Sequence, residues 1–197
     1  MRGYSQRYES ALALAARAHR NQVRKVDNSP YIVHLVQVSV ILLRYGFSED
    51  VAIAGLLHDI VEDQRYPLDS IQAGFGPQVA EMVAALTERK QEAGVKLPWE
   101  LRKAESLAQI REASDGAAAI KAADVLHNAY TLAACLRQRG PSIWQEFSRG
   151  PGPTLEYYGR ITAVVRQRLG AHRLVEELEE AMQDLARAVA NVKEPRA

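Results

Sequence analysis

Apolar residues recur along this chain three and four positions apart, the spacing that places them on one face of a helix. No convincing alternation of apolar and polar positions indicates a β-strand. The predicted helices cover about Ser5–Arg20, Ile32–Tyr45, Ser48 to just before Pro67, Leu68–Ala73, Pro77–Thr87, Pro98–Ala113, Gly116–Arg139, Thr154–Leu169 and His172–Asn191. The pattern therefore predicts an all-α protein.

The segments between these helices are polar or rich in glycine and proline, which is typical of loops. They are predicted to form a loop over Asn21–Pro30, a mobile loop over Glu88–Leu97 and a long connection over Gly140–Pro153. The last predicted helix carries one apolar stripe, made of Leu174, Leu178, Met182, Leu185 and Val189. We expect this stripe to pack inside its own domain, because most such stripes are buried there.

At 197 residues the chain has the length of one domain with its own core. Its formal charge of +1 lacks the positive excess expected of a nucleic-acid-binding protein. Its apolar runs are shorter than the ~20 residues that cross a membrane, and residues 1–6 contain none, so neither a membrane span nor a signal peptide is expected. The single cysteine, Cys135, is expected to be a buried, inert thiol and favours a cytoplasmic protein.

The most informative chemical feature is the pair His58 and Asp59, which follows the apolar run 54–57. A His-Asp pair alone is common by chance, but charged groups in an apolar helix are costly unless they have partners. His34 lies upstream and Asp124 downstream, so the chain offers two imidazoles and two carboxylates. Such a set suits one divalent cation, and its mixed nitrogen and oxygen donors favour Mn or Fe, with Zn also open.

Two further carboxylates, Glu62 and Asp63, follow this pair by about one helical turn. Acidic residues near a helix end are often only solvated. Beside a bound cation they could instead act on the water that the cation activates. If the four ligands converge, the sequence predicts a metal-dependent hydrolase.

Polar residues beside two of the predicted ligands are candidates for substrate contact. Asp124, His127 and Asn128 share one helix face, so the last two could orient Asp124 or touch a substrate. Arg24 and Lys25 lie in the loop shortly before the first predicted ligand. Basic residues in a loop are usually solvated, but near a cation site they could bind phosphate or stack on a base.

In combination these motifs resemble the HD-domain phosphohydrolases, and more closely the hydrolase domain of the RelA/SpoT-homologue family. The resembling stretches are residues 18–25, 30–34, 56–63 and 120–128, with Phe75, Gly76, Val79, Val83, Thr131 and Leu132. Their order and spacing hold from about residue 8 to residue 135, which makes the resemblance specific to this family. Beyond Arg139 it rests on helical character alone.

The resemblance implies a single HD-domain helical bundle over residues 1–197, with a motif-bearing core at about 5–139 and C-terminal helices at about 154–191. It also implies a small stand-alone, Mn²⁺-dependent hydrolase that removes the 3′-pyrophosphate from guanosine tetra- or pentaphosphate (ppGpp or pppGpp). By the matching motifs, the metal ligands would be His34, His58, Asp59 and Asp124. The residues that position and activate water would be Glu62 and Asp63. The nucleotide contacts would be Arg24, Lys25, Asn128 and Thr131.

The chain departs from the family at three positions. Gln64 stands where a threonine is usual, and Val125 and Tyr130 stand where arginines are usual. Tyr130 is expected near the nucleotide, where its ring could stack on a base but cannot replace a cation against phosphate. An adenosine analogue such as ppApp, or another phosphorylated nucleotide, therefore stays open as the substrate. A non-catalytic nucleotide-sensing module is the other alternative, and the oligomeric state is left open.

Overall fold

The computed structural model describes residues 4–191. Two segments lie outside the described residues. They are residues 1–3, which belong to the N-terminal stretch where no signal peptide is expected, and residues 192–197, at the end of the expected domain. The described helices are α1 (Gln6–Ala18), α2 (Ile32–Arg44), α3 (Glu49–Leu57), α4 (Ile60–Gln64), α5 (Leu68–Phe75), α6 (Pro77–Leu86), α7 (Trp99–Glu112), α8 (Asp115–Arg139), the 3₁₀ helix η1 (Gly140–Glu146), α9 (Pro151–Leu169) and α10 (Arg173–Asn191). The other regular elements are two short strands, β1 (Gln91–Glu92) and β2 (Val95–Lys96), so the all-α prediction is confirmed.

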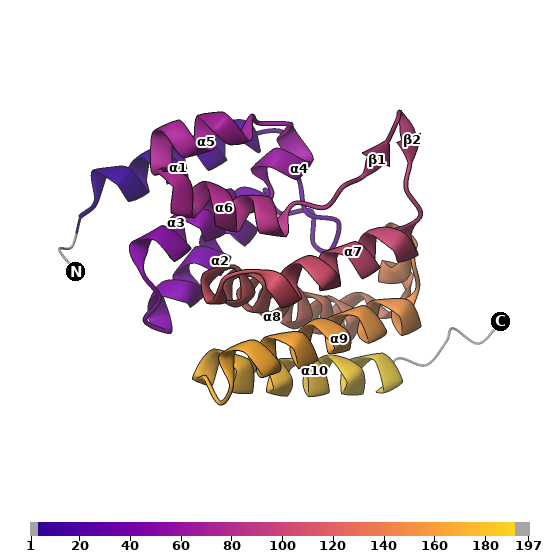
Figure 1. Ribbon diagram of the computed structural model, residues 1–197. Helices are drawn as coiled ribbons and strands as arrows, with labels where there is room; N and C mark the ends of the chain where they lie inside the picture. The colour runs from indigo at the N-terminus through magenta and orange to yellow at the C-terminus, as the bar shows by residue number, and fades with distance from the viewer. Residues whose placement is uncertain (1–3, 192–197) are drawn as a thin grey trace.

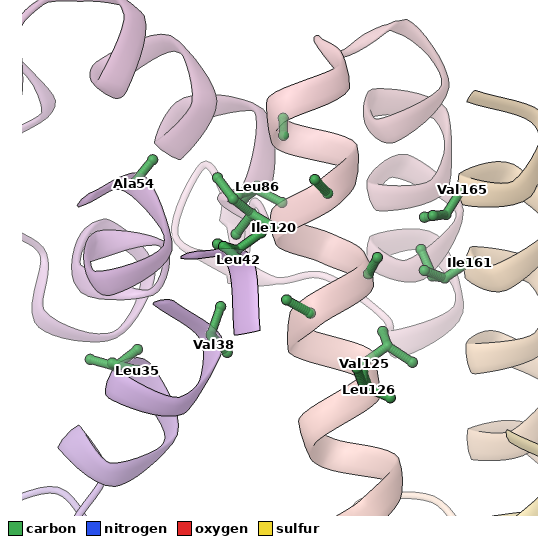
Figure 2. Close-up of a cluster of buried hydrophobic side chains, with 14 of the residues drawn as sticks. Leu35, Val38, Leu42, Ala54, Leu86, Ile120, Val125, Leu126, Ile161 and Val165 are labelled. Carbon is green, nitrogen blue, oxygen red and sulfur yellow. The ribbon is translucent and has the colours of Figure 1, made fainter. Parts of the chain in front are cut away.

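Helix α8 lies between two groups of helices (Figure 1). It packs against α2, α3 and α6 on one side and against α9 and α10 on the other. Figure 2 shows the same arrangement in the core, with Val38 and Leu42 of α2 on one side of α8 and Ile161 and Val165 of α9 on the opposite side. Residues of α8 are therefore surrounded by protein from several directions.

The sequence of α8 explains its central position. Ser114 caps the helix by accepting a hydrogen bond from the backbone N–H of Ala117 at 3.3 Å. The following turns are rich in alanine, and buried residues occur on nearly every side of the helix. A helix that buries apolar residues on most of its sides belongs largely in a core. Asp124, in the middle of α8, is therefore carried into an apolar interior where its carboxylate needs partners.

The predicted third helix is two helices, because the chain turns at His58 and Asp59. The Nδ1 of His58 lies 2.8 Å from the carbonyl oxygen of Gly55. This contact offers the carbonyl a side-chain partner inside the helical ladder, where such insertions commonly bend or break a helix. The break falls at the His-Asp pair itself and decides where both side chains point.

The segment Glu88–Leu97, predicted as a mobile loop, contains regular structure, because β1 and β2 pair there as an antiparallel hairpin. Ala93 and Gly94 connect the strands with φ values of +47° and +81°. Positive φ at both central residues is what a tight hairpin turn requires. Strands of two residues are too short to show an alternating pattern, so apolar periodicity could not predict them.

The connection predicted over Gly140–Pro153 is shorter in the structure. It begins with η1, and α9 starts at Pro151 instead of Thr154. Proline suits the first turn of a helix, because its missing N–H would have no helical partner there. These prolines, which indicated a loop in the sequence, therefore lie partly in the first turn of a helix.

The apolar stripe of α10 packs inside the protein, as predicted. Leu174, Leu178 and Leu185 are fully buried, and Met182 and Val189 are partly buried against the same core. The stripe faces α8 and α9, so the C-terminal helices cover the side of α8 that α2 does not. None of the helices within residues 4–191 is both long and apolar enough to cross a membrane.

We expect Gly55→Ala to lower the free energy of unfolding by about 1–2 kcal/mol, because α2 and α3 touch at this glycine. A Cβ at this position would lie 2.6 Å from Cδ1 of Leu42 and 3.5 Å from Cγ1 of Val38. Both side chains are fully buried, so neither can move aside without disturbing the core. This overlap outweighs the ~1 kcal/mol that alanine gains over glycine within a helix. Chemical denaturation measures the difference.

Gly159→Ala in α9 is the matched control. A Cβ there would have no atom within 4 Å, so the substitution should raise the free energy of unfolding by about 0.5–1 kcal/mol. An equal gain in stability at both glycines would contradict the close approach of α2 and α3.

Candidate metal centre

Side chains from three parts of the chain meet where α2, the α3–α4 junction and α8 come together. His34 lies in the first turn of α2, His58 and Asp59 form the junction, and Asp124 lies in α8. The donor atoms of His34, His58 and Asp59 all lie within 4.8 Å of one another. Asp124 joins this group through His34, because Oδ1 of Asp124 lies 3.4 Å from Nε2 of His34. The structure thus brings together the four residues predicted as ligands.

His58 directs one ring nitrogen into this group. Its Nδ1 donates to the carbonyl of Gly55, so Nε2 is the nitrogen left for a ligand. Nε2 is buried and lies 3.1 Å from Oδ2 of Asp59, yet it makes no hydrogen bond within residues 4–191. Two potential metal-ligand atoms this close, with no hydrogen bond between them, are suited to coordinate one cation together.

The charges of the group also favour a cation. Burial lowers the pKa of His58, but the carboxylate of Asp59, with help from Asp124, outweighs it and raises the pKa to about 9. Burial alone would raise the pKa of Asp59, but His58 holds it well below its usual range. The lowered pKa values of Asp59 and Asp124 leave both carboxylates ionised at neutral pH. Their field favours a positive charge between them, either the proton on His58 or a cation that displaces it.

Asp124 has two partners on its own helix. The Nζ of Lys121 lies 2.9 Å from Oδ2, and Nδ2 of Asn128 donates to Oδ1 at 2.6 Å. Burial opposes ionisation, but Lys121 and His34 hold the pKa of Asp124 well below its usual range. The carboxylate is therefore both charged and fixed in orientation inside the core.

Asp59 is held by the hydroxyl of Tyr31, which donates to Oδ2 at 2.5 Å. The ring of Tyr31 stacks on His19 and meets His34 edge-on, with centroid distances of 5.2 and 5.6 Å. Burial and the neighbouring Asp59 raise the pKa of Tyr31 well above its usual value, so its hydroxyl remains a donor. The phenol thereby fixes the carboxylate from the side of the α1–α2 loop.

Glu62 and Asp63 stand in α4, directly after this group, and both contact Lys90 at the base of the hairpin. The Nζ of Lys90 lies 3.1 Å from Oε1 of Glu62 and 2.8 Å from Oδ1 of Asp63. The other oxygen of Glu62 accepts from the backbone N–H of Glu88 at 3.1 Å. Burial and Asp59 raise the pKa of Glu62, while Lys90 opposes this rise. A carboxylate with a raised pKa is suited to accept a proton from water.

Open grooves lie on both sides of Asp63. One, of about 480 Å³, is lined in part by Glu62, Asp63 and Lys90. The other, of about 520 Å³, is lined in part by Arg17, Arg20 and Asp63. Water and a substrate can therefore reach the two carboxylates of α4 from the surface.

Three of the predicted nucleotide contacts form one polar cluster. Arg24 is buried, and its Nη2 donates to Oδ1 of Asn128 at 3.0 Å and to Oγ1 of Thr131 at 2.9 Å. Its Nη1 lies 3.7 Å from Oδ2 of Asp27. Lys25, the next residue, is exposed. The α1–α2 loop and α8 thus present a basic group next to the carboxylates.

Tyr130 lies apart from this cluster. Its hydroxyl donates to Oε1 of Glu177 on α10 at 3.2 Å, and the residue is 42% exposed. Glu177 also accepts a hydrogen bond from Tyr45. Val125, the other position where the family usually has an arginine, is buried in the core. Neither residue contributes a charge to the group around Asp124.

Sequence reasoning missed four side chains that hold the carboxylates: Tyr31, Lys121, Lys90 and Gln22. Lys121 had a usable signal, because it stands three positions before Asp124 on one helix. Gln22 donates from Nε2 to Oδ2 of Asp63 at 2.8 Å, across a separation of 41 residues. Lys90 is separated from Asp63 by 27 residues, and it lies in a segment with no periodic pattern. Contacts over such separations leave no local trace in a sequence.

Known proteins resemble this chain over most of its length. The HD domain family matches residues 11–149. Guanosine-3′,5′-bis(diphosphate) 3′-pyrophosphohydrolase MESH1 of Homo sapiens is 35% identical over 178 residues, which cover 89% of this chain and 90% of that protein. A GTP pyrophosphokinase of Streptomyces coelicolor is 35% identical over 184 residues, which cover 92% of this chain and 19% of that protein.

A solved structure described as a metazoan orthologue of SpoT that hydrolyses ppGpp has a TM-score of 0.78 and 28% identity, covering 96% of this chain and 99% of that one. The matched residues 11–149 contain the four residues predicted as ligands and the two carboxylates of α4. The chain therefore belongs to the HD domain family, and the small hydrolase MESH1 is one of its relatives.

Proposed function

We propose that this protein is a divalent-metal-dependent hydrolase that removes the 3′-pyrophosphate from ppGpp or pppGpp. The observation that carries the proposal is a group of two imidazoles and two carboxylates, in which donor atoms of His34, His58 and Asp59 lie within 4.8 Å of one another and Asp124 lies 3.4 Å from His34. The carboxylate of Glu62 is near enough for the charge of Asp59 to help raise its pKa. The named activity of MESH1, which is 35% identical across 89% of this chain, supports the choice of substrate.

The cation would be held by ring nitrogens of His34 and His58 and by carboxylate oxygens of Asp59 and Asp124. Carboxylate-rich sites with nitrogen ligands suit Mn²⁺, which we propose as the native metal. When bound, such a cation polarises the phosphoryl group and lowers the pKa of water. Nε2 of His58 makes no hydrogen bond within the part of the chain that the structure describes, and the pKa values of both aspartates lie below their usual range. Both observations support this assignment.

Glu62 would accept the proton of the attacking water, and Asp63 would orient that water from the groove. The water oxygen bonds to the phosphorus that carries the ribose 3′ oxygen, and the bond between this phosphorus and that oxygen breaks. Pyrophosphate and GDP are then the products of ppGpp, and the proton taken by Glu62 balances the one that the ribose oxygen gains. The raised pKa of Glu62 supports its role as the base.

The nucleotide would be recognised by Arg24, Lys25, Asn128 and Thr131. Arg24 is held by hydrogen bonds to Asn128 and Thr131, so little side-chain freedom is lost when its guanidinium binds a ligand. Lys25 is exposed and can reach a phosphate. Tyr130 stays a proposed contact through its ring, which is 42% exposed and can stack on a base while its hydroxyl donates to Glu177.

We also propose that the whole chain acts as one domain. The family match ends at residue 149, so this part of the proposal rests on packing. Helices α9 and α10 cover α8, which carries Asp124, and their apolar side chains belong to the same core as those of α2 and α3.

The proposed location is the cytoplasm. Cys135 is a free, buried thiol with no disulfide partner in the chain, which fits a reducing compartment. The proposed substrate, a free nucleotide, also fits this location.

A product assay tests the function. The purified, metal-stripped protein is incubated with Mn²⁺, Fe²⁺ or Zn²⁺ and with ppGpp, pppGpp, ppApp or GTP, and the released anion is identified. We expect pyrophosphate from ppGpp and pppGpp, with the highest rate in Mn²⁺. The Asp59→Asn variant serves as the control for contaminating activity, because it removes one proposed ligand.

Other outcomes separate the alternatives. Pyrophosphate released faster from ppApp than from ppGpp would shift the substrate to the adenosine analogue. Orthophosphate as the product would indicate a different nucleotide phosphohydrolase. Nucleotide binding without turnover, in every metal, would favour the sensing module and contradict the proposed activity.

Lys90→Met is expected to move the acid limb of the kcat/KM profile to higher pH by on the order of one unit. Glu62 must be ionised to act as a base, so activity falls as the pH drops through its pKa. Lys90 lowers that pKa through the contact at 3.1 Å, and its removal therefore raises it. Measurement of kcat/KM between about pH 5 and 9 gives the shift.

Lys96→Met is the matched control, because Lys96 lies on β2 of the same hairpin and is exposed. Its pH profile should coincide with that of the wild type. An acid limb that moves to lower pH in Lys90→Met, or does not move, would refute the role given to Lys90.

A further inference from the structure

His127 touches the candidate metal centre without being one of the four residues predicted as ligands. Its Nδ1 lies 2.8 Å from the Nδ1 of His34, and the two ring centroids are 5.0 Å apart. His127 stands on α8 three positions after Asp124. The sequence placed it on the face of Asp124, but its hydrogen-bond partner is the imidazole of α2.

Two ring nitrogens at 2.8 Å share one proton, because a hydrogen bond needs one donor and one acceptor. The other nitrogen of His34, Nε2, faces Oδ1 of Asp124 at 3.4 Å and thus points into the group of carboxylates. A nitrogen that binds a cation must be deprotonated. The neutral ring of His34 then carries its proton on Nδ1 and donates it to Nδ1 of His127.

This assignment fixes the second ring as well. If Nδ1 of His127 is the acceptor, its own proton lies on Nε2. His127 must therefore be a neutral imidazole of one defined tautomer for His34 to present Nε2 to a cation. The partner of His58, by contrast, is the backbone carbonyl of Gly55, which can only accept. The orientation of His34 depends on a side chain that a substitution can remove.

We propose that His127 is a positioning residue that sets the tautomer and the ring orientation of His34 for cation binding. The inference rests on the proposed role of His34 as a metal ligand. Partners that orient ligand imidazoles in this way commonly change metal affinity by about 10–100-fold when they are lost. Because His127 and Asp124 stand on one helix, α8 supplies one proposed ligand and positions another.

Two substitutions at this position separate the hydrogen bond from the packing. The amide oxygen of asparagine can take the place of Nδ1 as an acceptor, so His127→Asn should keep the contact. His127→Leu fills similar space but offers no acceptor. Metal-stripped wild type and variants are titrated with Mn²⁺ alone, and the electron paramagnetic resonance signal of the free ion gives the Kd. We expect a Kd within about threefold of wild type for His127→Asn and a 10–100-fold weaker Kd for His127→Leu.

The tautomer is measured directly by nitrogen-15 NMR of histidine-labelled protein loaded with Zn²⁺, a diamagnetic cation, because the argument applies to the ring of His34 with a cation at Nε2. A proton on Nδ1 of His34 and on Nε2 of His127 is expected, and the reverse arrangement would overturn the proposal even if a variant failed to fold. His172→Asn is the control, because it removes an imidazole at the start of α10, away from the site, and leaves an amide that can cap the helix. Its Kd should equal that of the wild type.

The remaining outcomes distinguish this inference from the proposed function. Equal Kd values for wild type and a folded His127→Leu would overturn the positioning role and leave the metal site intact. Equal weakening of Mn²⁺ binding in the leucine and asparagine variants would show that a hydrogen-bond acceptor at position 127 is not what supports the metal site, and would overturn the proposal. A wild-type protein that binds no divalent cation would refute the metal site and this inference together.

Discussion

Asp124→Asn is expected to weaken Mn²⁺ binding at least about 100-fold and to lower kcat/KM by about 10³ or more. The change removes one of two negative charges that would hold the cation. In the wild type, Nζ of Lys121 lies 2.9 Å from the carboxylate of Asp124. The variant leaves this lysine as a buried charge without its counter-ion. Burial lowers the pKa of Lys121, and Asp124 holds it well above the usual value, so this lysine should lose its proton more easily in the variant. A Mn²⁺ titration and steady-state kinetics measure both effects.

Asp115→Asn provides the control on the same helix. The side chain of Asp115 is 71% exposed and pairs with Arg168, so Mn²⁺ affinity and kcat/KM should stay at wild-type values. If Asp124→Asn bound Mn²⁺ with wild-type affinity while remaining folded, Asp124 would not be a ligand.

Glu62→Gln is expected to lower kcat by about 10²–10⁴ while Mn²⁺ affinity stays within a few-fold of wild type. The amide keeps the size of the side chain and can still accept from the backbone N–H of Glu88, but it cannot take a proton from water. The variant should also lose the acid limb of the pH profile, because the group that titrates in that limb is gone. Kinetics from about pH 5 to 9 and a Mn²⁺ titration separate the two effects.

Glu81→Gln on α6 is the matched control, because this glutamate is exposed and its replacement should leave kcat unchanged. A Glu62→Gln variant that loses Mn²⁺ affinity as strongly as Asp124→Asn would indicate that Glu62 is a ligand. One that keeps wild-type kcat would leave the reaction without the proposed base.

Residue types and local spacing were enough to select the residues that meet at the candidate site. Apolar periodicity identified α2 and α8, and a histidine or carboxylate in such a helix is costly unless it has partners. This argument selects His34 and Asp124 one by one. The distance of 3.4 Å between Nε2 of His34 and Oδ1 of Asp124 depends on how α2 packs against α8, and no local sequence pattern encodes this packing.

Two features escaped prediction for a related reason. The break between α3 and α4 depends on the ring of His58 reaching the carbonyl of Gly55, and helix periodicity continues through this point. The place of Lys90 depends on a hairpin whose strands have two residues each. Interactions of single side chains with distant groups set both features, so their position became visible only in the folded chain.

The central position of α8 limits how this protein can change during evolution. Residues on both sides of Asp124, such as Ala123 and Val125, are fully enclosed by neighbouring helices, so a substitution there alters core volume together with the chemistry. New substrate preferences are therefore more accessible through segments that meet the site from the surface, namely the loop that carries Lys25 and the hairpin that follows Lys90. Insertions and exchanges in these two segments can reshape recognition while the interior stays intact.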